Sequence, residues 1–268
     1  MLTHRHGAVE CLQFPGVDPA WPLVHGITTR AGGVSPGTWA SLNLGFGSGD
    51  EPARVRENQR RACAALGLSP RHLAYMQQVH SANVAMLREP AADPVWATGQ
   101  LRRLPATDAL ITAQPGVVLL ARGADCPLIL LYAPDRQVVA VVHSGWRGTF
   151  ANIAGRAVTL LRTELGCDPT QVFAGIAPCI SADNYEVGPD LIERLPTVTA
   201  QPERFCREHH GRWHLDLPGL ITWQLRQAGV RNIQAAGICT FSDPRFFSHR
   251  RDGAQAGRCG LLAALAGG

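Results

Sequence analysis

The stretch that decides the fold is VVLLARGADCPLILLYAPDRQVVAVVHSGWRG, residues 117–148. Three short apolar runs lie in it, at residues 117–120, 128–132 and 138–142. Runs this short and this apolar are typical of strands that are buried on one or both faces. Because only a turn at residues 133–135 separates the last two runs, they are expected to be adjacent strands. We therefore expect Cys126, before one of them, and His143, after the other, to converge.

Other segments indicate further elements. Apolar segments that predict strands lie at residues 78–87, 172–176 and 233–239. Helix starts and glycine stops predict helices at residues 53–66, 149–165 and 216–229. The expected first residues or caps of these helices are Asp50, Thr149 and Asp216. Strand-rich stretches separated by few long helices favour an α+β fold, with layered mixed sheets flanked by helices, in a single domain over residues 1–268.

The basic side chains are all of one kind. The chain of 268 residues has 25 basic and 21 acidic side chains, and every basic one is arginine. The absence of lysine excludes a Schiff-base lysine, a lysine-anchored pyridoxal cofactor and the lysine of a phosphate-binding P-loop. Any phosphate must therefore be held by arginine, by backbone N–H groups or by a metal ion.

Charge and hydropathy bear on whether the protein binds nucleic acid or membranes and on its cellular location. A net charge of +4, with the arginines spread along the chain, does not support a nucleic-acid-binding surface. No apolar run approaches the ~20 residues that span a bilayer, and the N-terminus lacks the apolar region of a signal peptide. We expect a cytoplasmic protein with no nucleic-acid or membrane partner, as a monomer, with a homodimer as the alternative.

Two histidines and a cysteine form a candidate metal site. His80 lies in the polar part of the segment predicted as an alternating strand, and it joins Cys126 and His143 as a possible third ligand. Three protein ligands with an open fourth position describe a catalytic zinc site. Copper is the alternative, but nothing in the spacing aims Met76 or Met86 at the site as an axial ligand. A cysteine in an apolar run is often core packing, and the sequence leaves that interpretation open.

The segment after His143 has the features of an anion site. A glycine-bounded turn at residues 144–148 leads from a strand into a helix, which presents free backbone N–H groups to a ligand. Arg147 adds a planar fork suited to phosphate or carboxylate. A structural turn with Arg147 in a surface ion pair is the alternative.

Short motifs spread over nearly the whole chain resemble the laccase-domain family of the YfiH type, described both as multicopper polyphenol oxidoreductases and as purine nucleoside phosphorylases. The matching motifs lie at residues 26–35, 41–45, 49–50, 78–80, 107–110, 124–127, 143–148, 185–188, 239–240 and 247–251. The resemblance implies layered sheets flanked by helices, similar to a bacterial cytotoxic deamidase that uses a Cys/His pair. It also places His80, Cys126 and His143 on the metal-ligand positions of the family.

The same resemblance implies an activity. Members phosphorolyse adenosine, inosine, guanosine and methylthioadenosine and deaminate adenosine, so purine nucleosides and phosphate are the expected partners. This chain departs from the family at several positions, including Gly123, Ser144 and His249, and in residues 181–184. None of these positions is a proposed ligand, but those near the pocket can alter substrate preference.

The remaining site residues are assigned on weaker grounds. Beside the catalytic set of His80, Cys126 and His143, we expect Asp125 to orient a ligand histidine or move a proton, or else to cap the turn at Pro127. Arg30 and Asn43 lie in glycine-rich loops and are candidate substrate contacts.

Two other enzymatic functions compete with a zinc-dependent phosphorylase. A copper polyphenol oxidase requires several His-x-His pairs, and His4 and His6 form the only one. A metal-free hydrolase that uses Cys126 and His143 on an amide, including a peptidoglycan precursor, is the second alternative. A non-catalytic partner-binding protein is the third interpretation, and a tight nucleoside site without turnover would reveal it.

Overall fold

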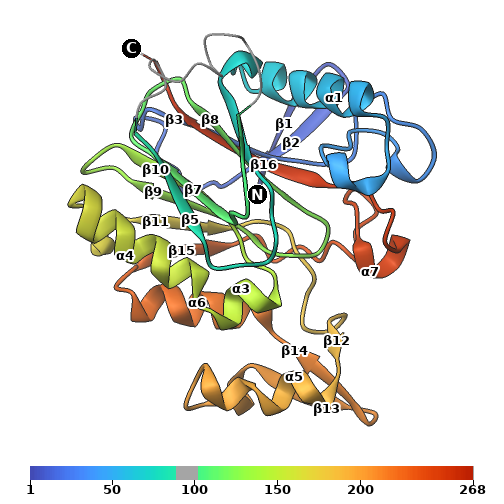
Figure 1. Cartoon of the computed structure of the whole chain (residues 1–268), viewed down its shortest axis with the longest axis vertical. Helices are drawn as coiled ribbons and strands as arrows, with labels where there is room; N and C mark the ends of the chain where they lie inside the picture. The colour runs from blue at the N-terminus through green and yellow to red at the C-terminus, as the bar shows by residue number, and fades with distance from the viewer. Residues whose placement is uncertain (89–101, 268) are drawn as a thin grey trace.

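Two large β-sheets lie face to face at the centre of the molecule (Figure 1). The computed structural model describes residues 1–88 and 102–267. The strands of the seven-stranded sheet are, in order, β1 (Leu2–His6), β2 (Val9–Gln13), β3 (Leu23–Thr28), β16 (Cys259–Leu265), β8 (Val118–Gly123), β4 (Leu73–Met76) and β6 (Arg102–Leu104). Those of the six-stranded sheet are β15 (Asn232–Ala235), β11 (Phe173–Ile176), β9 (Leu128–Ala133), β10 (Val138–His143), β7 (Ala109–Thr112) and β5 (Val84–Leu87).

The three strands predicted in residues 117–148 run through the middle of these sheets as β8, β9 and β10. β9 and β10 are antiparallel neighbours, and His143 lies opposite Leu128. Both strands are buried along their whole length. Successive side chains point to opposite faces, so that Leu130 packs between the two sheets and Ile129 packs beneath the helices. Burial on both faces explains why the runs are apolar at nearly every position.

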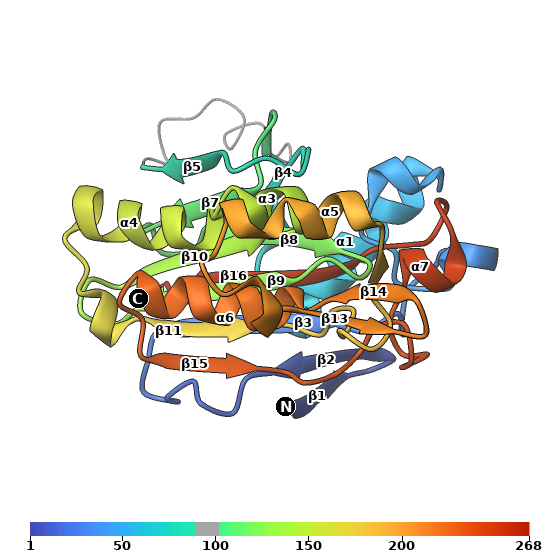
Figure 2. The same cartoon turned by 90° about the horizontal axis from the view of Figure 1, so that it is seen from below.

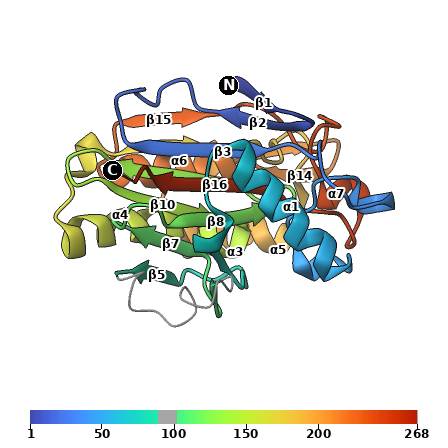
Figure 3. The same ribbon diagram turned by 90° about the horizontal axis from the view of Figure 1, so that it is seen from above.

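Helices cover the outer faces of the paired sheets. The α-helices are α1 (Pro52–Ala65), α3 (Trp146–Phe150), α4 (Ile153–Leu165), α5 (Pro189–Glu193), α6 (Leu217–Gln227) and α7 (His249–Asp252). α1 packs on the seven-stranded sheet through Ala62 and Cys63, and Figure 3 shows it lying over that sheet. α4 and α6 pack on the six-stranded sheet through Val158 and Ile221 (Figure 2). This layering of helix, sheet, sheet and helix confirms the predicted α+β fold.

A small third sheet lies beyond α6 (Figure 1). Its strands are, in order, β12 (Glu186–Val187), β14 (Arg212–Leu215) and β13 (Cys206–His209). Together with α5 it encloses a separate hydrophobic cluster around Phe205 and Leu215, against which Trp146 of α3 packs. Because Trp146 follows closely after His143 in the chain, this sheet adjoins the end of β10.

The helix predicted at residues 149–165 is interrupted. Asn152 has a left-handed backbone, with φ of 56°, between α3 and α4. Its side chain caps α4 by accepting a hydrogen bond from the N–H of Gly155. Asparagine tolerates this conformation because its short polar side chain bonds locally. The prediction of one long helix is therefore wrong, and Thr149 lies within α3.

The N-terminal end of α1 also differs from the prediction. Glu51 is the N-cap, while the carboxylate of Asp50 is buried and accepts hydrogen bonds from Ser35 and Asn43. The cap predicted at Asp216 is confirmed, because its side chain accepts from a backbone N–H in the first turn of α6. Among the described residues, no helix has both the length and the apolar character of a membrane span.

The strand predicted over residues 78–87 is confirmed only at its end, as β5. The residues before it form a loop, in which His80 has a left-handed φ of 61°. The strands predicted at residues 172–176 and 233–239 correspond to β11 and to β15, although β15 ends earlier than expected. His80 therefore reaches its position from a loop, and the geometry of that loop has to be explained by its contacts.

Candidate active site

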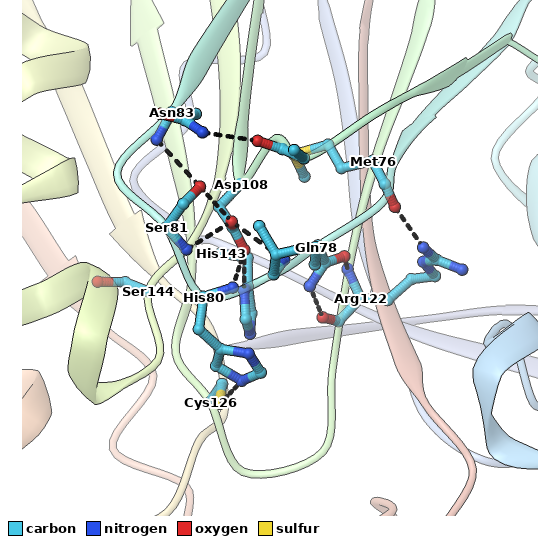
Figure 4. Close-up of polar contacts among 12 residues, drawn as sticks. Met76, Gln78, His80, Ser81, Asn83, Asp108, Arg122, Cys126, His143 and Ser144 are labelled. Atoms are coloured by element: carbon cyan, nitrogen blue, oxygen red, sulfur yellow. Dashed lines mark hydrogen bonds and ion pairs between the residues drawn. The ribbon is translucent and has the colours of Figure 1, made fainter.

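The three candidate ligands meet where β9 begins and β10 ends (Figure 4). Cys126 precedes β9, His143 ends β10, and His80 comes from the loop between β4 and β5. Their ligand atoms all lie within 4.8 Å of one another. The Sγ atom of Cys126 is 3.9 Å from Nε2 of His80, and the ring centroids of the two histidines are 4.9 Å apart. The structure thus brings together the set predicted from the sequence.

The buried carboxylate of Asp108 positions two of the three candidate ligands, His80 and His143. Its Oδ1 atom is 2.9 Å from Nδ1 of His143. Its two oxygens also accept hydrogen bonds from the backbone N–H groups of Val79, His80 and Ser81, and Oδ2 accepts another from the Ser81 hydroxyl. These bonds hold the loop that carries His80 in its left-handed conformation. The side chain of Asp108 is fully buried, so these contacts replace water.

The charges of the three groups depend on one another. Burial alone raises the pKa of Asp108, but hydrogen bonds from His143 and Ser81 outweigh it and lower the pKa to about 2. Burial lowers the pKa of His143, but its bonds to Asp108 and Cys126 raise it to about 9. Burial raises the pKa of Cys126, whereas His143 and His80 lower it to about 6. Without a metal ion, the site at neutral pH contains a carboxylate, an imidazolium and a thiolate.

The arrangement fits a zinc ion. Zinc bonds of about 2.0–2.3 Å in a tetrahedron bring neighbouring ligand atoms to roughly 3.3–3.8 Å, close to the 3.9 Å between Cys126 and His80. The bond from Nδ1 of His143 to Asp108 leaves Nε2 for the metal, and a carboxylate behind a ligand histidine is the usual outer partner of such sites. A thiolate with two imidazoles is a donor set that zinc and copper both accept.

The glycine at position 145 leaves room for these ligands. A Cβ atom at Gly145 would lie 2.6 Å from Cδ2 of His80 and 3.1 Å from Sγ of Cys126. Only a residue without a side chain allows the turn after β10 to pass this close to them. The sequence indicated this glycine as part of an anion-binding turn, but its contact with the ligands was not predicted.

A cavity of about 670 Å³ opens beside the three ligands, within the range of small-molecule sites. The aromatic side chains that line it are Phe46, Tyr75, Trp146 and Tyr185. The cationic side chains that line it are Arg103, Arg122, Arg147, Arg250 and Arg258. Burial raises the pKa of Tyr185, so its phenol is neutral at physiological pH. The cavity thus offers aromatic faces and cations next to the metal ligands.

Arg147 lies at this cavity, as the sequence predicted for an anion contact. The predicted order of strand, turn and helix is present, since β10 leads through Ser144 and Gly145 into α3. The guanidinium of Arg147 is exposed and lies 4.3 Å from the centroid of the Trp146 ring. It makes no hydrogen bond or ion pair with the described residues, so the alternative of a surface ion pair has no partner there.

The expected role of Asp125 in orienting a histidine is corrected, because Asp108 holds that position. The carboxylate of Asp125 is buried and accepts hydrogen bonds from the hydroxyls of Thr240 and Ser248 and from the N–H of Arg250. It anchors the start of α7, which carries Arg250 to the cavity wall. A role in proton transfer stays a prediction.

The two candidate substrate contacts from glycine-rich loops do not line the cavity. The guanidinium of Arg30 donates to the backbone oxygen of Ala40 and lies 4.6 Å from the centroid of the Phe247 ring, which gives it a packing role. Asn43 is fully buried and bonds Ser48 and the backbone of the loop. Because residues 45–48 line the cavity, Asn43 shapes the wall without touching its contents.

Sequence reasoning missed Asp108. It lies in the motif at residues 107–110, to which no role was given. The available signal was its place directly before the apolar strand β7, which pairs with β10. An acidic residue at that end of a neighbouring strand is close to His143, but the pairing of β7 with β10 was not predicted.

The chain matches a known protein family and has named relatives in bacteria. Residues 24–266 match the family described as multi-copper polyphenol oxidoreductase laccase. A Deinococcus radiodurans protein named purine nucleoside phosphorylase is 38% identical over 92% of this chain and 91% of its own. A Corynebacterium glutamicum protein of that name is 37% identical over 90% of this chain and 94% of its own.

Solved structures show the same fold. The YlmD protein of Geobacillus stearothermophilus has a TM-score of 0.87 and 31% identity, covering 99% of each chain. The hypothetical protein YfiH of Bacillus licheniformis has a TM-score of 0.87 and 28% identity, covering 97% of each chain.

We predict that Asp108→Asn weakens zinc binding by about 10–100-fold, because the neutral amide is a weaker acceptor for the Nδ1–H of His143 and cannot accept all the loop hydrogen bonds. Zinc affinity is measured by competition with a chromophoric chelator. Asp125→Asn is the control, since its carboxylate contacts neither histidine, and it retains wild-type affinity. Equal affinities for Asp108→Asn and the wild type would contradict the role of Asp108.

We predict that Gly145→Ala displaces His80 and lowers zinc affinity, while the protein still folds, because the new methyl group meets only side chains near the surface of the site. Gly47→Ala is the matched control, because a Cβ atom there has nothing within 4 Å. Circular dichroism checks the fold, and the same competition assay measures the metal. Wild-type zinc affinity in Gly145→Ala would show that the close approach has no consequence.

Proposed function

We propose that this chain is a zinc-dependent purine nucleoside phosphorylase. It belongs to the family described as multi-copper polyphenol oxidoreductase laccase. Two bacterial relatives of the chain are named purine nucleoside phosphorylase. The proposed substrates are adenosine, inosine, guanosine and methylthioadenosine, with phosphate. Deamination of adenosine at the same site is part of the proposal.

One observation carries it: His80, Cys126 and His143 converge at the wall of a cavity that also presents aromatic rings and arginines. A purine ring binds by stacking on aromatic faces, and a phosphate binds to guanidinium forks. Both kinds of group lie beside the three ligands. No copper cluster of several ions is needed to explain this combination.

In phosphorolysis, a phosphate oxygen forms a bond to C1′ of the ribose while the bond from C1′ to the purine nitrogen breaks. The electron pair leaves with the base, which takes up a proton. Arg147 binds the phosphate and orients it toward the sugar. Trp146 and Tyr185, which line the cavity beside it, hold the nucleoside and exclude water.

Zinc held by His80, Cys126 and His143 supplies Lewis-acid chemistry at this wall. Asp108 keeps the imidazole of His143 fixed with Nε2 directed away from the carboxylate. Deamination needs water in place of phosphate as the nucleophile, with ammonia as the leaving group from the purine carbon. The same cavity serves both reactions, because each requires an oxygen nucleophile beside a bound nucleoside.

A second candidate function rests on the charges of the metal-free site. The pKa of Cys126 at about 6 and of His143 at about 9, with Asp108 behind the histidine, describe a thiolate–imidazolium pair with an orienting carboxylate. Such a set acts as a nucleophile on amides in cysteine hydrolases. A peptidoglycan precursor is a substrate of this kind.

The copper oxidase alternative has less support from the geometry. Among the described residues, His80, Cys126 and His143 form the one group of three or more candidate ligands. The His-x-His pair of the sequence, His4 and His6, lies on the edge strand β1, where Nε2 of His4 is 3.1 Å from the backbone oxygen of Ala65. A multicopper centre requires several such groups close together.

We predict that Cys126→Ala and His80→Ala lose nearly all phosphate-dependent release of adenine from adenosine, and that ammonia release falls with it. His210→Ala is the control, since His210 is exposed and does not line the cavity. Free base and ammonia are followed with and without phosphate. If both cavity variants keep bound metal and wild-type phosphorolysis, the proposed function is wrong.

We predict that, after removal of zinc by a chelator, iodoacetamide modifies Cys126 with a rate that rises through a midpoint near pH 6 instead of the ordinary 9. The thiolate is the reactive form, so the rate is high above this midpoint and falls below it. In His143→Gln the midpoint moves upward. Peptide mass spectrometry separates Cys126 from Cys239, whose pKa is about 7, where hydrogen bonds from Ser181 outweigh burial.

The same experiment separates the two candidate functions. A zinc enzyme loses phosphorolysis on chelation, and its Cys126 is protected from iodoacetamide until the metal is removed. A cysteine hydrolase remains active after chelation, and its Cys126 is modified at the same rate before and after.

A further inference from the structure

Three arginines on the seven-stranded sheet form a second cationic group in the cavity, apart from Arg147. Arg103 lies on β6, Arg122 on β8 and Arg258 just before β16. In the order β16, β8, β4, β6, strands β16 and β8 are neighbours, and β4 alone separates β8 from β6. The register brings them closer, since Arg103 pairs with Tyr75 of β4, and Arg122 pairs with the residue two beyond Arg258. We call Arg103, Arg122 and Arg258 the arginine cluster.

No carboxylate among the described residues forms an ion pair with the arginine cluster, although ten other arginine–carboxylate pairs are present there. Burial, together with the charges of Arg103 and Arg258 and against the effect of Tyr75, lowers the pKa of Arg122 to about 10. Like charges without a counter-ion destabilise one another when they are partly removed from water. An anion in the cavity would relieve this repulsion.

The guanidinium groups of the arginine cluster have donors left for such an anion. Nε of Arg122 is buried and has no hydrogen-bond partner among the described residues, while Nη2 donates to the backbone oxygen of Met76. Arg258 uses Nη1 on the backbone oxygens of Ala256 and Gly257. Arg103 is exposed and makes no side-chain hydrogen bond with the described residues.

The side chain of Gln78 holds the backbone of Arg122 in place. The side-chain amide of Gln78 donates to the oxygen of Arg122 at 2.7 Å, and its carbonyl accepts from the N–H of Arg122 at 3.0 Å (Figure 4). The guanidinium of Arg122 lies 5.1 Å from the centroid of the Tyr75 ring. Since Gln78 belongs to the loop that also carries His80, one loop positions both a metal ligand and an arginine.

The position of Arg258 is fixed by a glycine. A Cβ atom at Gly45 would lie 2.6 Å from Cγ of Arg258, so only glycine lets this side chain pass into the cavity. Burial lowers the pKa of Arg258, while the charges of Cys126 and Asp125 act in the opposite direction. Arg258 is therefore held against the segment at residues 45–48, where both line the cavity.

We propose that Arg103, Arg122 and Arg258 bind a phosphoryl group. They line the cavity from the seven-stranded sheet, whereas Arg147 lines it from α3, which follows β10 of the six-stranded sheet. Several guanidinium forks lining one part of a cavity match the tetrahedral, doubly charged phosphoryl group better than a carboxylate. Two sources carry this group: inorganic phosphate as co-substrate, for which the arginine cluster would take the role proposed above for Arg147, and the 5′-phosphate of a purine nucleotide. The assignment of the second source rests on the proposed function, because the purine then occupies the same cavity.

The test is binding and turnover with Arg103→Gln in the zinc-loaded protein. Arg103 has no side-chain hydrogen bond among the described residues, so the variant folds. Arg156→Gln is the matched control, because Arg156 is exposed on α4, forms no ion pair with the described residues and does not line the cavity. Calorimetry measures the affinity for inorganic phosphate and for adenosine 5′-monophosphate, and release of adenine from adenosine is followed at varied phosphate.

If inorganic phosphate is the ligand, Arg103→Gln raises its Kd and KM about tenfold or more and leaves the Kd of adenosine unchanged. If the 5′-phosphate is the ligand, the Kd of adenosine 5′-monophosphate rises by that factor and the KM of inorganic phosphate does not. Arg258→Gln weakens binding of the same anion by a similar factor. Arg156→Gln keeps the wild-type Kd for both anions and the wild-type KM for inorganic phosphate.

Wild-type affinities for both anions in Arg103→Gln and Arg258→Gln would overturn the proposal. Failure of this proposal and failure of the proposed function give different results. If adenosine is not cleaved but anion binding falls in the variants, the phosphorylase assignment fails and the phosphoryl site stands. If adenosine is cleaved and anion binding is unaffected in the variants, the phosphoryl site fails and the phosphorylase assignment stands.

Discussion

The buried carboxylate of Asp108 is the contact on which the rest of the site depends. Its oxygens receive hydrogen bonds from His143 and from the backbone N–H groups of Val79, His80 and Ser81. One side chain thus fixes the ring of one ligand and the backbone of another. Its pKa of about 2, set by these bonds against the effect of burial, keeps it ionised over the whole physiological range. A buried charge is tolerated here because every part of it is hydrogen-bonded.

The stacked sheets provide the frame in which this carboxylate can act. β7, β10 and β9 are neighbours, so Asp108 before β7, His143 at the end of β10 and Cys126 before β9 lie at one edge. Rigid strands hold two of the ligands, and the loop after β4 carries His80 across the edge. The cavity forms between this edge, the segment at residues 45–48 that carries Phe46, and α7, which carries Arg250.

Much of this arrangement was predictable from sequence, and its limits have physical causes. The convergence of Cys126 and His143 followed from two apolar runs joined by a short turn. The conformation of His80 did not, because the alternation over residues 78–87 resembles a strand and only the distant Asp108 reveals the loop. Asp125 was given the orienting role because it adjoins Cys126 in sequence. Its carboxylate instead bonds Thr240 and Ser248, which are more than a hundred residues away.

A chain without lysine has to bind anions with arginine, backbone N–H groups or a metal ion, and the arginines of the cavity fall into two groups. Arg147 and Arg250 lie against the aromatic rings of Trp146 and Tyr185, while the arginine cluster lies on the opposite sheet. X-ray absorption at the zinc edge tests the central claim most directly. A first shell of one sulfur at about 2.3 Å with two imidazole nitrogens at about 2.0–2.1 Å is the predicted result. A shell without sulfur, or with more than one, would contradict it.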